Sequence, residues 1–178
     1  MRQQNCGRQF DRLPADDSER TVSNRATREE VLSFFEDRFG IPPHTFEAYS
    51  FWEKGKGKVW AFRGSIASPV RVEALGIHVL RTRQRFWKPT TDGMQRFGDD
   101  ATNNVIVVSP DEAAAFWRGD TQSIDTSAED GYVLVAQTLV DAPVPLGVGL
   151  YIDGVLQSVV PKSRQRKIAP LPVNDEPA

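Results

Sequence analysis

The stretch that decides the fold of the C-terminal half is Leu146-Gly-Val-Gly-Leu-Tyr-Ile-Asp-Gly-Val-Leu-Gln-Ser-Val-Val160. Its two apolar segments, 146–152 and 155–160, have the length and composition of β-strands. Asp153-Gly154 between them is a strong signal for a two-residue hairpin turn. The sequence therefore predicts an antiparallel hairpin here, and segment 132–138 supplies a further strand before it.

Upstream of this hairpin, Ser109-Pro-Asp-Glu112 has the features of a helix start. Ser is a capping residue, Pro suits the first turn, and Glu stands at the capping-box position. Gly119 is placed to end that helix. Segments 77–80 and 104–108 are predicted strands, and 89–97 is predicted to be a short helix. Short helices among several strands indicate an α+β fold.

The N-terminal part carries a second helix signal. Thr27 and Glu30 form a capping box, and Gly40 stands where a left-handed stop belongs. A glycine-rich turn, Lys54-Gly-Lys-Gly-Lys58, lies between two of the strands predicted next, which are 46–52, 59–63 and 70–72. We therefore expect residues 26–73 to form a small α/β unit.

The two ends of the chain differ from the rest in composition. Residues 1–25 are polar with few apolar anchors, and residues 169–178 contain three prolines. Both segments are expected to be flexible tails.

Overall composition excludes several classes of protein. Hydrophobic residues make up 39% and charged residues 26%, which is an ordinary globular balance. No apolar run is long enough to span a bilayer or to serve as a secretory signal. Cys6 is the single cysteine, so an internal disulfide and a cysteine zinc cluster are excluded, and His44 and His78 alone do not indicate a metal site. We expect a cytoplasmic protein with no catalytic residues, no cofactor and no metal.

Basic residues gather in two runs although the net charge is only −2. If the first run is a strand, its arginines share one face, with Phe86 and Trp87 beside them to stack on bases. The alternative is a solvated edge on which Trp87 anchors the loop in the core, and the second run has a frayed basic chain end as its alternative. The candidate RNA-binding residues are Arg81, Arg83, Arg85, Trp87 and Lys88 in the first run, and Lys162, Arg164, Arg166 and Lys167 in the second.

Several of these motifs follow one another in a known order. They run from Leu75-Gly-Ile77 and Arg81-Thr-Arg-Gln-Arg85 through 109–119 to Pro145-Leu-Gly-Val-Gly149 and Val160-Pro-Lys162. This order resembles the C-terminal RNA-binding, PUA-like extension of Sun/Fmu-type rRNA and tRNA cytosine-5 methyltransferases. The resemblance implies a PUA-like mixed-β barrel with short flanking helices over residues 74–168, with Lys162 at the family's Pro-Lys position.

The remainder of the chain resembles these proteins in part. Phe39-Gly-Ile41 and the hairpin after it are similar to the small α/β linker that precedes this extension in some members. The chain as a whole resembles an uncharacterised archaeal family of stand-alone proteins. It has no glycine-rich cofactor loop, and Cys6 lies in an expected tail, whereas the methyltransferase reaction needs a thiolate that adds to the pyrimidine ring. Only the RNA-binding role is therefore carried over.

The sequence thus predicts a small N-terminal α/β unit followed by a PUA-like mixed-β barrel with short flanking helices. We expect a non-catalytic protein that binds structured rRNA or tRNA, in RNA modification or ribosome maturation, alone or beside a separate RNA methyltransferase. This reading requires the two basic runs to form one patch free of carboxylates. The alternative is a protein-interaction subunit without an RNA-binding face, which joint exposure of Trp52, Trp60 and Trp87 would favour.

Overall fold

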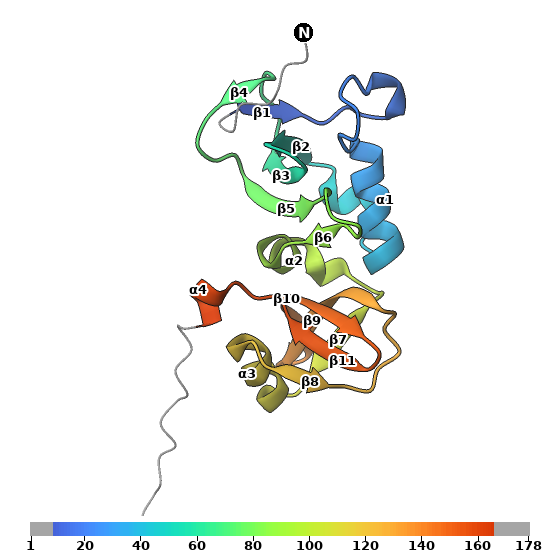
Figure 1. Ribbon diagram of the computed structural model, residues 1–178, viewed down its shortest axis with the longest axis vertical. Helices are drawn as coiled ribbons and strands as arrows, with labels where there is room; N and C mark the ends of the chain where they lie inside the picture. The colour runs from blue at the N-terminus through green and yellow to red at the C-terminus, as the bar shows by residue number, and fades with distance from the viewer. Residues whose placement is uncertain (1–8, 166–178) are drawn as a thin grey trace, which may run out of the picture.

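Two β-sheets and several short helices make up the protein in the computed structural model, which describes residues 9–165 (Figure 1). The elements in chain order are β1 (Gln9–Arg12), η1 (Asp17–Glu19), α1 (Arg28–Phe39), η2 (Pro43–Phe46), β2 (Tyr49–Lys54), β3 (Lys58–Arg63), β4 (Val70–Arg71), β5 (Ile77–Arg81), β6 (Lys88–Pro89), α2 (Thr91–Phe97), η3 (Gly98–Asp100), β7 (Val105–Val108), α3 (Pro110–Arg118), β8 (Thr121–Ser123), β9 (Gly131–Leu139), β10 (Ala142–Ile152), β11 (Val155–Ser158) and α4 (Lys162–Gln165). The fold is mixed α+β, as the sequence predicts. Across the described residues, no helix has both the length and the apolar character needed to cross a membrane.

The first sheet has the strand order β4-β1-β2-β3-β5-β6, and every pair of neighbours is antiparallel. β2 and β3 form the predicted hairpin. Its turn holds Gly55 and Gly57 at φ of 73° and 69°, a left-handed conformation that glycine adopts without a steric penalty. The strand before the turn begins at Tyr49 rather than at residue 46, because Pro43–Phe46 forms a 3-10 turn instead.

Helix α1 begins and ends where the sequence predicts. The Thr27 hydroxyl accepts a hydrogen bond from the Glu30 N–H, and the Glu30 carboxylate accepts one from the Thr27 N–H. Gly40 ends the helix at φ 66°. The helix lies along one side of the first sheet (Figure 1) and buries its apolar stripe, which consists of Val31, Phe35 and Phe39.

The second sheet has the order β7-β9-β10-β11-β8 and is curled like half of a barrel. β7 is parallel to β9, and the other neighbours are antiparallel. The predicted β10–β11 hairpin is confirmed, with Asp153 and Gly154 at φ of 50° and 80°. Gly147 and Gly149 face the interior, where an added Cβ would press on neighbouring side chains, so these glycines allow close packing.

Helix α2 lies between the two sheets and contacts both (Figure 1). A Cβ on Gly93 would stand 2.9 Å from the Cα of Val79 in β5, so the glycine lets the helix approach the first sheet closely. α3, beside the second sheet, begins at the predicted capping box of Ser109 and Glu112 and ends at Gly119. These helices connect two sheets that share one interior.

A single apolar cluster crosses from one sheet to the other. It contains Val31 and Phe35 of α1 together with Leu134 and Val148 of the second sheet. β5 and β6 pair with the first sheet rather than with the second. The expected boundary between residues 73 and 74 therefore falls within the first sheet, and the structure does not divide there.

The segment predicted as an N-terminal flexible tail is part of this core. β1 pairs with β2 on one side and with β4 on the other, and Phe10 is completely buried. Arg25 forms a 2.7 Å ion pair with Glu53, whose side chain is only 3% exposed. The prediction of a tail is therefore wrong for residues 9–25, because a few apolar anchors suffice when long-range strand pairing holds the backbone. The rest of that tail, residues 1–8, and the expected tail 169–178 lie outside the described residues.

Candidate nucleic-acid interface

Three cations stand opposite one another on adjacent strands of the first sheet. Lys58 of β3 is the partner of Arg81 of β5, and Arg81 is the partner of Lys88 of β6. Directly opposed residues in antiparallel strands place their side chains on the same face, and like charges in that position are destabilising. We call these three residues the cation row.

No acid neutralises the cation row within residues 9–165. The ion pairs of this part of the chain involve none of the three side chains. Burial lowers the pKa of Lys88, and the charge of Arg81 lowers it further. The Lys88 ammonium lies 5.7 Å from the centroid of the Tyr132 ring, which offers it a cation–π contact. The row is therefore a group of cations without an ion-pair partner among residues 9–165.

The charges of the cation row also affect the pKa of His78 in β5. Its imidazole stacks on the Trp60 indole with the ring centroids 5.2 Å apart. Burial lowers the pKa of His78 to about 4, and the charges of Arg81 and Lys58 add to this shift. The imidazole is consequently neutral at pH 7 and adds no charge to the interface.

The other arginines of the first run are in a loop, not on a strand. β5 ends at Arg81, so the predicted strand alternation of Arg81, Arg83 and Arg85 is wrong. The Thr82 N–H donates to the Gly57 carbonyl at 2.8 Å, which turns the chain over the β2–β3 turn. Arg83 and Arg85 remain exposed in this loop, which spans residues 82–87.

Two adjacent aromatic residues of this loop have opposite roles. Trp87 packs against Phe34 of α1, with ring centroids 5.6 Å apart, and joins the main apolar cluster. Phe86 is 66% exposed, and the Arg85 guanidinium lies 5.3 Å from the centre of its ring. The packing of Trp87 corresponds to the anchoring alternative. Phe86, which the sequence suggested as a stacking side chain beside Trp87 but which was not among the candidate RNA-binding residues, is the aromatic side chain presented to solvent.

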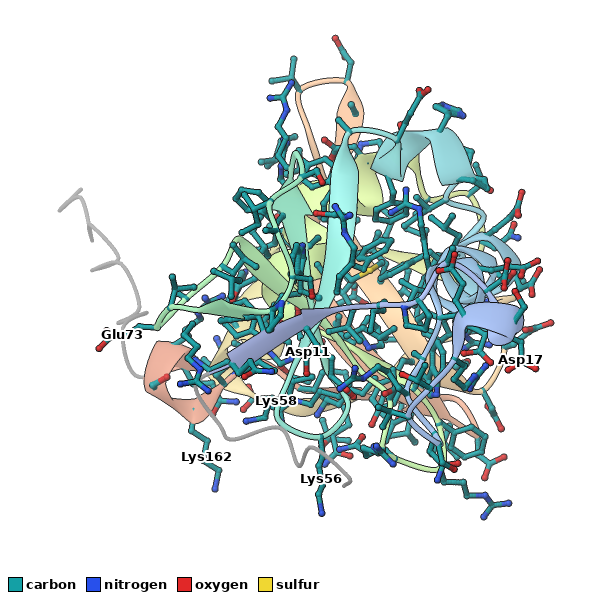
Figure 2. All side chains as sticks on the ribbon, turned by 90° about the horizontal axis from the view of Figure 1, so that it is seen from above. Asp11, Asp17, Lys56, Lys58, Glu73 and Lys162 are labelled. Atoms are coloured by element: carbon teal, nitrogen blue, oxygen red, sulfur yellow. The ribbon has the colours of Figure 1, made fainter. Side chains whose placement is uncertain are left out.

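The second basic run contacts α2, the helix that follows the first run in the sequence. Arg164 donates to Asp92 in the first turn of α2 at 2.6 Å, and the charge of Asp92 raises the pKa of His78, whereas the charges of Arg81 and Lys58 lower it. The expected patch free of carboxylates is therefore interrupted by Asp92. Lys162 is exposed, and Figure 2 shows it toward the same edge of the view as Lys56 and Lys58, with Asp17 at another edge. Arg166 and Lys167 lie outside the described residues.

The lysines of the β2–β3 turn differ in what they contact. Lys54 donates to the Glu73 carbonyl, and its ammonium lies 5.0 Å from the centre of the Phe10 ring. Both contacts stabilise the first sheet. Lys56 is exposed at the turn.

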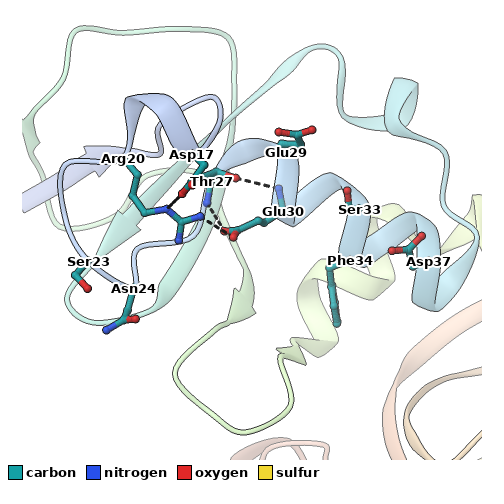
Figure 3. Close-up of a pocket in the computed structure, with 10 residues that line it drawn as sticks. All are labelled: Asp17, Arg20, Ser23, Asn24, Thr27, Glu29, Glu30, Ser33, Phe34 and Asp37. Atoms are coloured by element: carbon teal, nitrogen blue, oxygen red, sulfur yellow. Dashed lines mark hydrogen bonds and ion pairs between the residues drawn. The ribbon is translucent and has the colours of Figure 1, made fainter.

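One hollow of the protein has the opposite charge. It has a volume of about 820 Å³ and lies beside the start of α1 (Figure 3). Arg20, the cation among its described lining residues, is paired with Asp17 and Glu30 at 2.8 and 2.6 Å. The four carboxylates that line it are Asp17, Glu29, Glu30 and Asp37. An open hollow with this net negative charge repels phosphate, so it is not part of the interface.

The tryptophans do not form the joint patch that would favour a protein-interaction subunit. Trp52 is completely buried. Trp60 packs on a small cluster around Phe10, whereas Trp87 packs on the main cluster. In residues 9–165, no three His, Cys, Asp or Glu side chains are grouped so as to hold a metal ion.

A comparison with known families matches only the first part of the chain. A family model described as a family of unknown function (DUF7122) matches residues 1–76. No curated protein matches the chain. The matched segment contains Lys58 and ends before β5, so Arg81 and Lys88 of the cation row lie beyond it.

Proposed function

We propose that this protein binds structured RNA, rRNA or tRNA, through the cation row and the loop 82–87, without catalysing a reaction on it. The observation that carries the proposal is the alignment of Lys58, Arg81 and Lys88 on three strands with no acidic partner among the described ion pairs. In this proposal the curled sheet is a PUA-like module. The protein acts in the cytoplasm in RNA modification or ribosome maturation, alone or beside a separate RNA methyltransferase.

Like charges held opposite one another lower the stability of a sheet by ~0.2–1 kcal/mol per pair. A bound polyanion reverses the sign of this contribution, because each phosphate attracts two neighbouring cations at once. Strands are ~4.8 Å apart, so a row across three strands is about 10 Å long and follows a short length of backbone. Because the net charge of the whole protein is −2, RNA is attracted only by this local positive surface and not by the molecule as a whole.

The first experiment removes charge from the row. The double variant Lys58→Gln/Arg81→Gln should bind an RNA hairpin about tenfold to a hundredfold more weakly, a loss of ~1.4–2.8 kcal/mol. The magnitude of the slope of log affinity against log salt should decrease by about 1.4 to 1.8, because two fewer phosphate contacts release counterions. Filter binding or fluorescence anisotropy at several salt concentrations measures both quantities.

The matched control is Arg63→Gln/Arg71→Gln, which removes the same charge from exposed positions of the same sheet. It should leave the affinity within about twofold of the wild type, since surface charges outside the contact act through a screened potential. Equal losses in both double variants would show that only the total charge matters. No loss in either would overturn the proposed interface.

A protein-interaction subunit remains the second candidate because of the β9–β10 turn. Val140 in this turn is 96% exposed at φ 59°, and Leu139 and Val144 beside it are also exposed. An apolar tip of this kind favours a protein contact. If Val140→Asn abolishes association with a separate RNA methyltransferase while RNA affinity is absent in the wild type, this second function is the correct one.

A further inference from the structure

Phe86 is the exposed aromatic side chain nearest to the cation row. It follows Arg85, whose guanidinium lies over its ring at 5.3 Å, and it is 66% exposed. Leaving a phenyl ring in water forgoes the hydrophobic stabilisation that its burial would give. The position therefore suggests a partner that covers the ring.

The loop that carries Phe86 is anchored at both ends. At its start, Thr82 is hydrogen-bonded to Gly57, and the Arg83 side chain packs close to the same glycine. At its end, Trp87 packs against Phe34. Phe86 is thus held by its neighbours at a defined place beside the row, so little conformational entropy is lost when a flat ligand stacks on it.

We propose that Phe86, together with Arg85, stacks on an unpaired base of the bound RNA. The inference rests on the proposed function and specifies its substrate class: structured RNA with an unpaired nucleotide next to the backbone segment held by the cation row. A base within an A-form duplex has no free face, because both faces are covered by its neighbours. Continuous duplex RNA is consequently a poorer ligand.

The charges around the ring favour a nucleotide over an apolar protein pocket. Arg83 and Arg85 are exposed beside Phe86, and Arg81 and Lys88 face each other at the base of the loop. A nucleotide brings a π-face and a phosphate together and matches this arrangement. A dry apolar pocket closing over Phe86 would have to desolvate the Arg85 guanidinium.

The acidic hollow limits the direction of the RNA strand. Phe34, on which Trp87 packs, also lines this hollow together with Glu30 and Asp37. On the side of the loop that faces the hollow, the carboxylates repel phosphates. On the other side, the cation row attracts them. The backbone attached to the stacked base therefore continues toward Arg81 and Lys88.

The test uses an RNA hairpin with 2-aminopurine at an unpaired loop position and a duplex of the same length with 2-aminopurine paired. The full-length protein should quench the fluorescence of the loop probe, since stacking on an aromatic ring quenches it. Phe86→Leu should abolish this quenching and weaken hairpin binding about fivefold to a hundredfold, the range found for loss of one stacked base. Phe86→Trp should retain both properties, and Leu139→Ala is the control for loss of an exposed apolar side chain.

The outcomes separate this inference from the proposed function. If Phe86→Leu binds and quenches like the wild type, the stacking role is wrong while RNA binding through the row stands. If Phe86→Leu weakens hairpin and duplex binding equally, the unpaired base is not the ligand of Phe86. If Phe86→Leu loses only a protein partner, Phe86 is a protein contact, and if the wild type binds neither RNA, the proposed function itself fails.

Discussion

The guanidinium of Arg164 donates a hydrogen bond to the carboxylate of Asp92 at 2.6 Å, and this pair ties α4 to the first turn of α2. It joins residues that are 72 positions apart in the sequence. Asp92 thereby neutralises a cation of the second basic run. It also lies near the first run, because its charge raises the pKa of His78 and so opposes the charges of Arg81 and Lys58. The pair weakens the positive potential of the proposed interface.

Replacing Asp92 by Asn should therefore strengthen RNA binding. Arg164 becomes available to a phosphate, and we expect the affinity to rise about threefold to tenfold, which corresponds to ~0.7–1.4 kcal/mol. Thermal stability should change little, since both side chains are about half exposed and such surface pairs contribute ~0–1 kcal/mol. Asp125→Asn removes an exposed carboxylate elsewhere and should leave the affinity unchanged. An equal gain in the two variants would mean that Asp92 has no local effect.

Burial of Phe10 makes the N-terminal segment necessary for folding. Phe10→Ala should lower the free energy of unfolding by ~3–5 kcal/mol, because it leaves a cavity between β1 and its neighbours. A chain beginning at residue 26 should lose its cooperative unfolding transition. Phe86→Ala makes the same change at an exposed position and should shift the urea midpoint only slightly. Cooperative melting of the shortened chain near the full-length temperature would contradict the role of β1.

The neutral imidazole of His78 predicts how stability depends on pH. Burial lowers its pKa in the folded protein to about 4, below the ordinary value of 6.5. The unfolded chain therefore binds more protons between these values, and the free energy of unfolding should fall as the pH is lowered from 6.5 toward 4. His78→Phe, which keeps a ring against Trp60, should flatten this part of the curve.

Val140 is strained in its turn. A β-branched residue at φ 59° is unfavourable, and two-residue hairpins favour Gly or Asn at such a position. Val140→Asn should raise the free energy of unfolding by ~1 kcal/mol, because the exposed side chain contributes no packing. Val155→Asn, at an exposed strand position, should give no gain, since valine suits a strand. Denaturant titration distinguishes the two.

Local signals in the sequence were sufficient for α1, α3 and the tight turns, whereas the helix expected over 89–97 begins at Thr91 because Lys88–Pro89 is a strand. The capping box at Thr27 and Glu30 and the turn at Asp153-Gly154 depend on residues close together in the chain, and both were predicted correctly. β1 and β8 were missed because each is short and polar and is stabilised by pairing with a distant strand. Pairing with a strand far away in the sequence produces no alternation of apolar and polar residues within β1 or β8 themselves.

Of the three residues of the cation row, Arg81 and Lys88 were among the candidates named from the sequence, and Lys58 was not. The cation row depends on the register of β3 against β5, which shifts at an irregularity between Val59 and Trp60. Whether Phe86 or Trp87 faces solvent is decided by Phe34, far away in the sequence. Two adjacent aromatic residues look equivalent in a sequence, and only the packing partner distinguishes them.

The shared core has a consequence for how the protein folds during synthesis. The apolar cluster beneath the first sheet is completed by Leu134 and Val148, and Arg38 of α1 donates to the Tyr132 carbonyl across 94 positions of sequence. Contacts this distant slow folding, because the intervening chain must be ordered before they form. The segment matched by the family model therefore emerges from the ribosome with an incomplete interior, and its strands and α1 can close their core only after residue 148 has also emerged.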